Sequence, residues 1–161
     1  MKRLKYEKRS NGKLVADSKV YQTESIFKQP KINDMFLQLK ANVCDLNPAL
    51  VTKCITGTEQ DFIMLMNRAK DFIEYSYPSI NEDSKKVLLE MFQQCVFGYY
   101  VLTPLIVAKD VSDIKVLSYD HVVVKANGER YVADVKFFSE EDYRLWYERI
   151  HRIHRLGRAE E

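Results

Sequence analysis

The fold is decided by the stretch HVVVKANGERYV, which runs from His121 to Val132. Two short runs rich in β-branched and aromatic residues flank Asn127-Gly128, and both residues of that pair tolerate the positive φ of a type I′ turn. The stretch therefore predicts a two-stranded antiparallel hairpin. A two-residue turn also sets the register, and it places Val124 opposite Tyr131.

The two faces of this hairpin differ in polarity. One face carries apolar side chains, namely Val122, Val124, Tyr131 and Ala133. The opposite face carries polar and charged side chains, namely His121, Lys125, Arg130 and Asp134. Successive side chains of a strand point to opposite faces, so we expect the apolar face to pack on helices. Lys125 and Arg130 are then candidate interaction residues that face solvent or a partner.

Three helical segments are predicted before the hairpin, because apolar residues recur there at steps of three and four. The first begins near Asn33 and ends before Pro48. The second follows Thr58 as N-cap, and the third begins near Asn81 and continues to a stop at Pro104. A strand over residues 114–117 then leads to the hairpin.

An amphipathic helix over residues 139–158 closes the pattern, with Ser139 as N-cap and Asp142 at the third helical position. Arginines occupy much of its polar side: Arg144, Arg149, Arg152, Arg155 and Arg158. Basic residues late in a helix favour its dipole while they stay solvated. The other interpretation is contact with nucleotide phosphates or a neighbouring subunit, for which the first four arginines are the candidate interaction residues.

These elements predict an α+β fold, in which N-terminal helices are followed by a small antiparallel sheet with an Asn-Gly hairpin and a C-terminal amphipathic helix. The chain has 161 residues, near the usual length of one domain. We expect a flexible basic arm over residues 1–30 and a single α+β domain over residues 31–161. Within that domain, residues 31–104 form the helical part, and residues 105–158 form the sheet and last helix.

Charge and cysteine content limit the function classes. The formal net charge is only +2, so global charge points to neither nucleic acid nor a membrane surface, although the first 13 residues carry six basic side chains. The three cysteines, Cys44, Cys54 and Cys95, are widely spaced among apolar neighbours, which is typical of buried thiols and predicts neither a disulfide framework nor a zinc site. No signal peptide or membrane-spanning run is recognisable, which favours the cytoplasm.

Motifs for catalysis are absent from the sequence. None of the five glycines is followed by Lys-Ser or Lys-Thr, so the chain has no phosphate-binding loop and we predict no ATP hydrolysis by this chain alone. His151 and His154 lie three residues apart on one helix, but no cysteine lies near them to complete a metal site. We therefore assign no catalytic residue, cofactor or metal ligand.

The stretches GYYVLTPLI (Gly98–Ile106) and DVSDIKV (Asp110–Val116), followed by the Asn-Gly hairpin, carry a family pattern. Together they resemble the N-terminal domain of type II and type IV secretion ATPases, closest to the Tad/Flp pilus branch. The resemblance covers roughly residues 83–158. It implies a short helix that ends in a turn, then a strand, the hairpin, a further strand and a helix.

The resemblance also implies a function. Such ATPases are cytoplasmic hexamers, in some cases peripheral at the inner face of the membrane, that use ATP and Mg²⁺ to drive pilus assembly, secretion or conjugation. The implied partners are other subunits of the hexamer and an inner-membrane platform protein. The sequence ends at Glu161 without the ATPase motifs, so we expect an N-terminal fragment or a stand-alone relative. The alternative function is a basic adaptor or nucleic-acid-binding module of a mobile element that uses residues 1–13.

Overall fold

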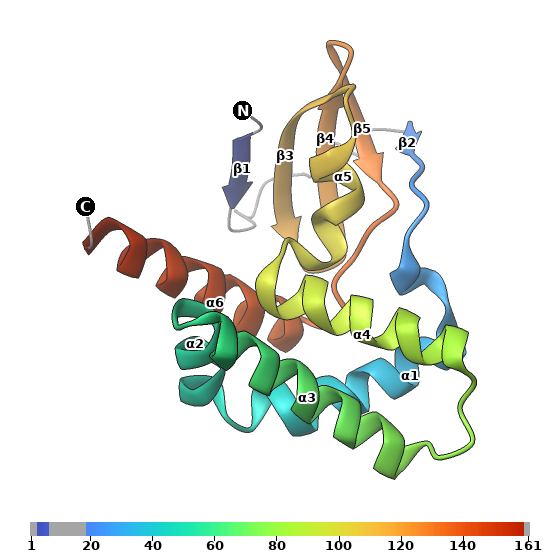
Figure 1. Cartoon of the computed structure of the whole chain (residues 1–161). Coiled ribbons are helices and arrows are strands. Elements are labelled where there is room, and N and C mark those ends of the chain that lie inside the picture. The colour runs from blue at the N-terminus through green and yellow to red at the C-terminus, as the bar shows by residue number, and fades with distance from the viewer. Residues whose placement is uncertain (1–2, 7–18, 160–161) are drawn as a thin grey trace. The chain divides into compact units, whose positions relative to one another are not determined.

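The computed structural model describes residues 3–6 and 19–159 and has the predicted α+β fold (Figure 1). Its strands are β1 (Arg3–Tyr6), β2 (Val20–Tyr21), β3 (Val111–Ser118), β4 (His121–Ala126) and β5 (Glu129–Ala133). Its α-helices are α1 (Pro30–Leu39), α2 (Pro48–Thr56), α3 (Glu59–Ser76), α4 (Glu82–Phe97), α5 (Thr103–Val107) and α6 (Glu140–Ala159). Shorter helical segments are η1 (Ile26–Lys28), η2 (Lys40–Asp45) and η3 (Tyr100–Leu102).

The chain forms two compact units. The sheet unit contains the described residues up to Ser25 together with Val101–Arg144, and the helical unit contains Ile26–Tyr100 and the described residues from Leu145 onward. This division differs from the predicted single domain over residues 31–161. The chain segment before Ile26 belongs with the sheet, and the second boundary falls inside α6.

In the sheet unit the described strands have the order β1-β3-β4-β5-β2 (Figure 1). β4 is antiparallel to both β3 and β5, whereas β1 and β2 add in parallel at the two edges. The predicted hairpin is confirmed: Val124 pairs with Tyr131, and Asn127 and Gly128 have φ values of 51° and 80°. Both values are positive, as a type I′ turn requires.

The prediction of a flexible arm over residues 1–30 is wrong for residues 3–6 and 19–28. β1 and β2 pair with the outer strands β3 and β5, which would otherwise expose unpaired backbone groups along their edges. Residues 7–18, which contain part of the predicted basic arm, lie outside the described residues. The error arose because such short strands carry almost no periodic signal.

Side chains also hold this N-terminal segment against the sheet. Tyr21 donates a hydrogen bond from its hydroxyl to Asp110 Oδ1 at 2.6 Å, and this bond, together with some burial and the charge of Asp110, raises the pKa of Tyr21 to about 12. Thr23 donates to the Asp134 carboxylate from its backbone N–H at 2.9 Å and from its hydroxyl at 2.7 Å. Residues 21–23 are thus fixed by polar contacts, in addition to the strand pairing of β2.

The predicted polarity of the hairpin is confirmed at its central positions, whereas His121 and Asp134, predicted on the polar face, are partly buried. Val122, Val124 and Ala133 are buried, while Lys125 and Arg130 are exposed. The buried apolar residues of β3 and β4 are Val111, Ile114, Val116, Val122, Val124 and Ala126. They form the core of the sheet unit, where α5 contacts β3.

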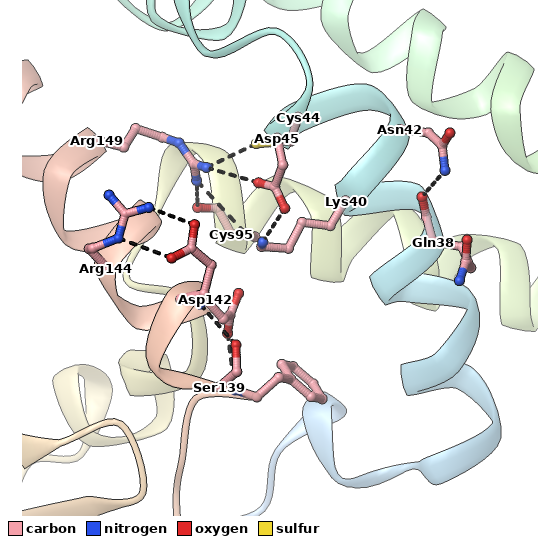
Figure 2. Close-up of polar contacts among 12 residues, drawn as sticks. Gln38, Lys40, Asn42, Cys44, Asp45, Cys95, Ser139, Asp142, Arg144 and Arg149 are labelled. Carbon is pink, nitrogen blue, oxygen red and sulfur yellow. Dashed lines mark hydrogen bonds and ion pairs between the residues drawn. The ribbon is translucent and has the colours of Figure 1, made fainter.

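The predicted caps Thr58 and Ser139 are found in the structure, and Asn81, near which the third helix was predicted to begin, is also a cap. Thr58 and Asp61 form a capping box at the start of α3, in which Asp61 Oδ2 accepts from Thr58 N at 2.9 Å. Asn81 Oδ1 accepts from the backbone N–H of Ser84 at 2.8 Å at the start of α4. At α6, Ser139 Oγ accepts from the backbone N–H of Asp142 at 3.0 Å (Figure 2).

Two prolines lie in the first turns of helices that the sequence did not predict, although the first predicted helix does end before Pro48. Pro48 opens α2 and Pro104 lies in the first turn of α5, where proline is tolerated because the first helical N–H groups have no partner. Pro30 likewise opens α1, which therefore begins before Asn33, and the side-chain amide of Asn33 donates to the Phe27 carbonyl at 2.7 Å. The third predicted helix, α4, ends at Phe97 and does not reach Pro104.

The segment η2 between α1 and α2 is a π-helix, which sequence periodicity did not predict. The wider π-helical turn shifts each following side chain around the axis relative to an α-helix. Leu46, which directly follows this segment, is 71% exposed. Lys40 is instead buried within this segment.

An aromatic cluster forms part of the core of the helical unit. Phe27, Phe36 and Tyr100 have ring centroids 5.0 to 5.9 Å apart. Tyr100 has a φ of 53°, a left-handed conformation that costs free energy for a side chain of this size, but its ring is completely buried. The favourable free energy of burying this ring offsets the strain of the backbone conformation.

We predict that replacing Gly128 with alanine lowers the free energy of unfolding by about 1–2 kcal/mol, the cost of placing a Cβ in a left-handed conformation. A Cβ at this position would meet no atom within 4 Å, so backbone conformation alone causes the loss. Urea unfolding measures it. Asn127→Gly is the matched control and should leave stability within about 0.5 kcal/mol, because glycine adopts positive φ readily. A neutral Gly128→Ala would contradict the type I′ turn.

Candidate functional site

A group of polar side chains lies buried in the helical unit around Arg149, one of the predicted interaction residues. Arg149 is only 8% exposed, although α6 carries it among arginines that the sequence places on the polar side. A buried guanidinium must satisfy its N–H groups inside the protein, since the lost hydration costs several kcal/mol. The hydrogen-bond partners of Arg149 therefore identify the elements that α6 contacts in this unit.

The guanidinium of Arg149 joins α6 to two other elements (Figure 2). Its Nη2 donates to the Cys44 Sγ of η2 at 2.9 Å. Its Nη1 donates to the backbone oxygen of Cys95 in α4 at 3.0 Å and lies 3.8 Å from the Cys95 Sγ. One side chain thus contacts residues 105 and 54 positions away in the sequence.

The contact with Cys95 also caps a helix end. Cys95 belongs to the last turn of α4, whose carbonyl groups have no partner within the helix. Trp146, one turn before Arg149 on α6, donates from Nε1 to the carbonyl of Gly98, the C-cap residue of α4, at 3.2 Å. Two α6 side chains therefore satisfy the C-terminal carbonyls of α4, and the positive charge of Arg149 favours the helix dipole there.

The π-helix η2 supplies the charged neighbours. Its first residue, Lys40, is 4% exposed and donates to Asp45 Oδ2 at 2.5 Å. Asp45 Oδ1 lies 3.9 Å from Arg149 Nη2 and accepts no hydrogen bond within the described part of the chain. Asp45 is thus shared by two cations, and the π-helical turn is what brings Asp45 to the same side of the segment as Lys40 and Cys44 (Figure 2).

The electrostatics of this cluster keep the thiol neutral and the guanidinium charged. Burial raises the pKa of the Cys44 thiol, and this effect exceeds the opposing effect of the Arg149 charge. For Arg149, burial acts to lower the pKa, but Cys95, Cys44 and Asp45 together raise the pKa above its ordinary value. A neutral, buried thiol is a poor nucleophile, because the thiolate is the reactive form.

A small cavity of about 40 Å³ adjoins the Arg149 cluster. Besides Cys44, Asp45 and Arg149, its lining includes Thr52 of α2 and Arg152 of α6. Arg152 is exposed and donates from Nη1 to Thr52 Oγ1 at 3.0 Å. The cavity is too small for a nucleotide or another organic ligand of similar size.

This arrangement supports a structural role. The cluster pairs no nucleophile with a general base, and among the described residues no group of three or more histidine, cysteine or carboxylate side chains lies close enough to hold a metal ion. The three cysteines are free and buried, as predicted. We therefore describe Arg149, Cys44, Asp45 and Lys40 as the anchor cluster, which connects α6, η2 and α4.

The other predicted interaction residues do not join this cluster. Lys125 and Arg130 lie on the hairpin of the sheet unit. Arg144 is exposed and pairs with Glu141 one turn earlier on α6, at 2.6 Å. Arg155 lies in α6, but the structure does not describe its side chain.

The prediction that Arg149 contacts a partner surface is corrected by its burial. The sequence shows it only as one of several arginines spaced along a helix, and Cys44, Asp45 and Lys40 were not recognised as its partners. Their positions near the C-terminal end of the predicted first helix gave no sign of the π-helical turn that places them. The sequence did predict that Cys44 and Cys95 are buried thiols, but a buried thiol does not indicate that a cation lies beside it.

Comparison with known proteins adds no family assignment. No protein-family model matches the chain, and no curated protein matches it significantly. In the part of the chain that the structure describes, no helix combines the length and apolar character needed to cross a bilayer. The resemblance to secretion ATPases accordingly rests on the sequence pattern described above.

We predict that Arg149→Met lowers the free energy of unfolding by roughly 2–4 kcal/mol, because it removes the hydrogen bonds to the Cys95 carbonyl and the Cys44 sulfur and the cation beside Asp45, while it keeps an apolar stem. Urea unfolding of the two arginine variants measures the difference. Arg144→Met is the matched control, since Arg144 is an exposed residue of the same helix in a surface ion pair, and it should cost less than about 1 kcal/mol. Equal stability of the two variants would contradict the anchor cluster.

Proposed function

We propose that this chain is the N-terminal, non-catalytic domain of a secretion or pilus-assembly ATPase, closest to the Tad/Flp branch. In this proposal the domain acts through its surfaces, by contacts with neighbouring subunits of a hexamer and with a membrane platform protein. The full protein would also contain a domain that carries the phosphate-binding loop. The surface contacts couple the N-terminal domain to the motion that ATP drives in that second domain. The proposed location is the cytoplasm, at the inner face of the membrane.

The main support is the order of elements in the segment that carries the resemblance. GYYVLTPLI runs from the C-cap of α4 through η3 into α5, and DVSDIKV leads into and forms most of β3. The Asn-Gly turn joins β4 and β5, and α6 follows. Helix, turn, strand, hairpin and last helix thus follow one another in the order that the resemblance implies. The further strand that the resemblance implies after the hairpin is not formed, since residues 135–137 belong to no strand.

The exposed hairpin is the surface that best fits a partner. Lys125 and Arg130 are cross-strand neighbours, and like charges directly opposite each other destabilise a sheet. Asp113 lies opposite Lys125 on β3, but neither basic side chain forms an ion pair within the described part of the chain. The repulsion between Lys125 and Arg130 would be relieved by an acidic surface, so we infer an acidic partner.

The arginines of α6 divide into two groups under this proposal. Arg144 and Arg152 are exposed and remain candidates for subunit contact, whereas the buried Arg149 holds α6 in place. This chain has no Gly-x-x-x-x-Gly-Lys-Ser/Thr motif, so its residues do not fit an ATP and Mg²⁺ site of the phosphate-binding-loop type. We assign none of them to ATP or Mg²⁺.

The proposal is tested with the product of the complete gene that encodes this chain. We expect that product to contain a phosphate-binding loop, to form a hexamer and to hydrolyse ATP. Reversing both hairpin charges, by Lys125→Glu and Arg130→Glu, should reduce ATPase activity about tenfold through loss of subunit contact, which corresponds to about 1.4 kcal/mol. Steady-state ATP hydrolysis and light scattering measure activity and assembly.

The matched control reverses two other exposed lysines, Lys31→Glu and Lys86→Glu, which gives the same change in net charge on the helical unit. This variant should keep its activity and its hexamer. A gene product without ATP hydrolysis, or a hairpin variant as active as the control, would contradict the proposal.

A further inference from the structure

Helix α3 presents an exposed line of four side chains, Met64, Arg68, Asp71 and Tyr75, which we call the α3 seam. Their spacing of four, three and four residues places them on one face of the helix. Met64 is 37% exposed and Tyr75 is 89% exposed. Tyr75 thus leaves a large aromatic ring almost entirely in solvent. Covering such a ring with an apolar surface is energetically favourable.

The surface beside the seam is hollowed. A shallow depression of about 340 Å³ is lined by six residues of α3: Gln60, Ile63, Met64, Asn67, Arg68 and Asp71. Ile63 is 40% exposed there. Arg68 and Asp71 form no ion pair within the described part of the chain, although each is exposed and they lie three residues apart. Both charges therefore remain open to a partner.

The seam is self-complementary when read in the opposite direction. Arg68 and Asp71 lie at equal distances from its midpoint, and so do Met64 and Tyr75. A second α3 that packs antiparallel therefore sets Arg68 against the partner's Asp71, and Met64 against the partner's Tyr75, with each contact made twice by symmetry. A parallel arrangement would instead set Arg68 against another arginine.

From this match of charged and apolar side chains we propose that α3 docks antiparallel against α3 of a second copy of the chain, to form a dimer with two-fold symmetry. The four seam residues are the centre of the contact. The proposal does not depend on the function proposed above, since it uses only residues of α3.

The contact should be weak. An 18-residue helix is about 27 Å long, and one helix pair of this length covers less surface than a stable protein interface of about 1,200–2,000 Å². We expect a dissociation constant on the order of 100 µM, with the two apolar contacts supplying the affinity and the four charges setting the direction. High local concentration would favour the dimer.

Charge exchange tests this arrangement in the full chain. In R68D every central contact is between two acids, and in D71R every one is between two bases. We expect each variant to dimerise at least tenfold more weakly, as measured by sedimentation equilibrium. An equimolar mixture of the two should dimerise as wild type does, because every central contact then joins an acid and a base. The double variant R68D/D71R should also recover the wild-type affinity.

Lys70→Asp is the control, since Lys70 is exposed on α3 but lies outside the seam. It should leave the dissociation constant within about twofold of wild type. Circular dichroism confirms that each variant keeps its helices. The proposal is overturned if the wild-type chain stays monomeric up to about 1 mM, which would leave the seam to solvent or to a different protein. It is equally overturned if the mixture of R68D and D71R fails to dimerise.

Discussion

The helical unit depends on the hydrogen bonds of one buried guanidinium. Arg149 carries a positive charge into the interior, and it is held there by the Cys44 sulfur, the Cys95 carbonyl and the nearby Asp45 carboxylate. Because these partners come from η2 and α4, the position of α6 within this unit is set by polar geometry as well as by apolar packing. Other positions of α6 are unfavourable, because a shifted α6 would leave the charge of Arg149 buried without its acceptors.

This constraint also explains why η2 is a π-helix. In a regular α-helix Lys40 and Cys44, four residues apart, would already share a face, but Asp45 would turn away from it; the wider turn brings Asp45 back beside them. The loss of regular geometry is offset by an ion pair between Lys40 and Asp45 and by a second cation near the same carboxylate.

Sequence reasoning succeeded where local chemistry decides the structure. Thr58, Asn81 and Ser139 cap their helices through side-chain oxygens, and Asn127-Gly128 fixes a turn, so each could be recognised from a few neighbouring residues. It failed where distant segments decide: the short strands β1 and β2 exist because outer sheet strands offer backbone partners, and Arg149 is buried because Cys44 and Cys95 meet it. The helix that Pro48 opens was missed, and Pro104 was misread as a helix stop, because proline both follows helices and occurs in their first turn.

Arg149 couples η2 and α4 to α6, and hydrogen–deuterium exchange of the Arg149→Met variant is the sharpest test of this coupling. We predict faster amide exchange in residues 40–45 and in the last turn of α4, as well as around residue 149, with Arg144→Met showing wild-type exchange at all three places. Exchange that accelerates only in α6, with η2 and α4 unchanged, would contradict the claim.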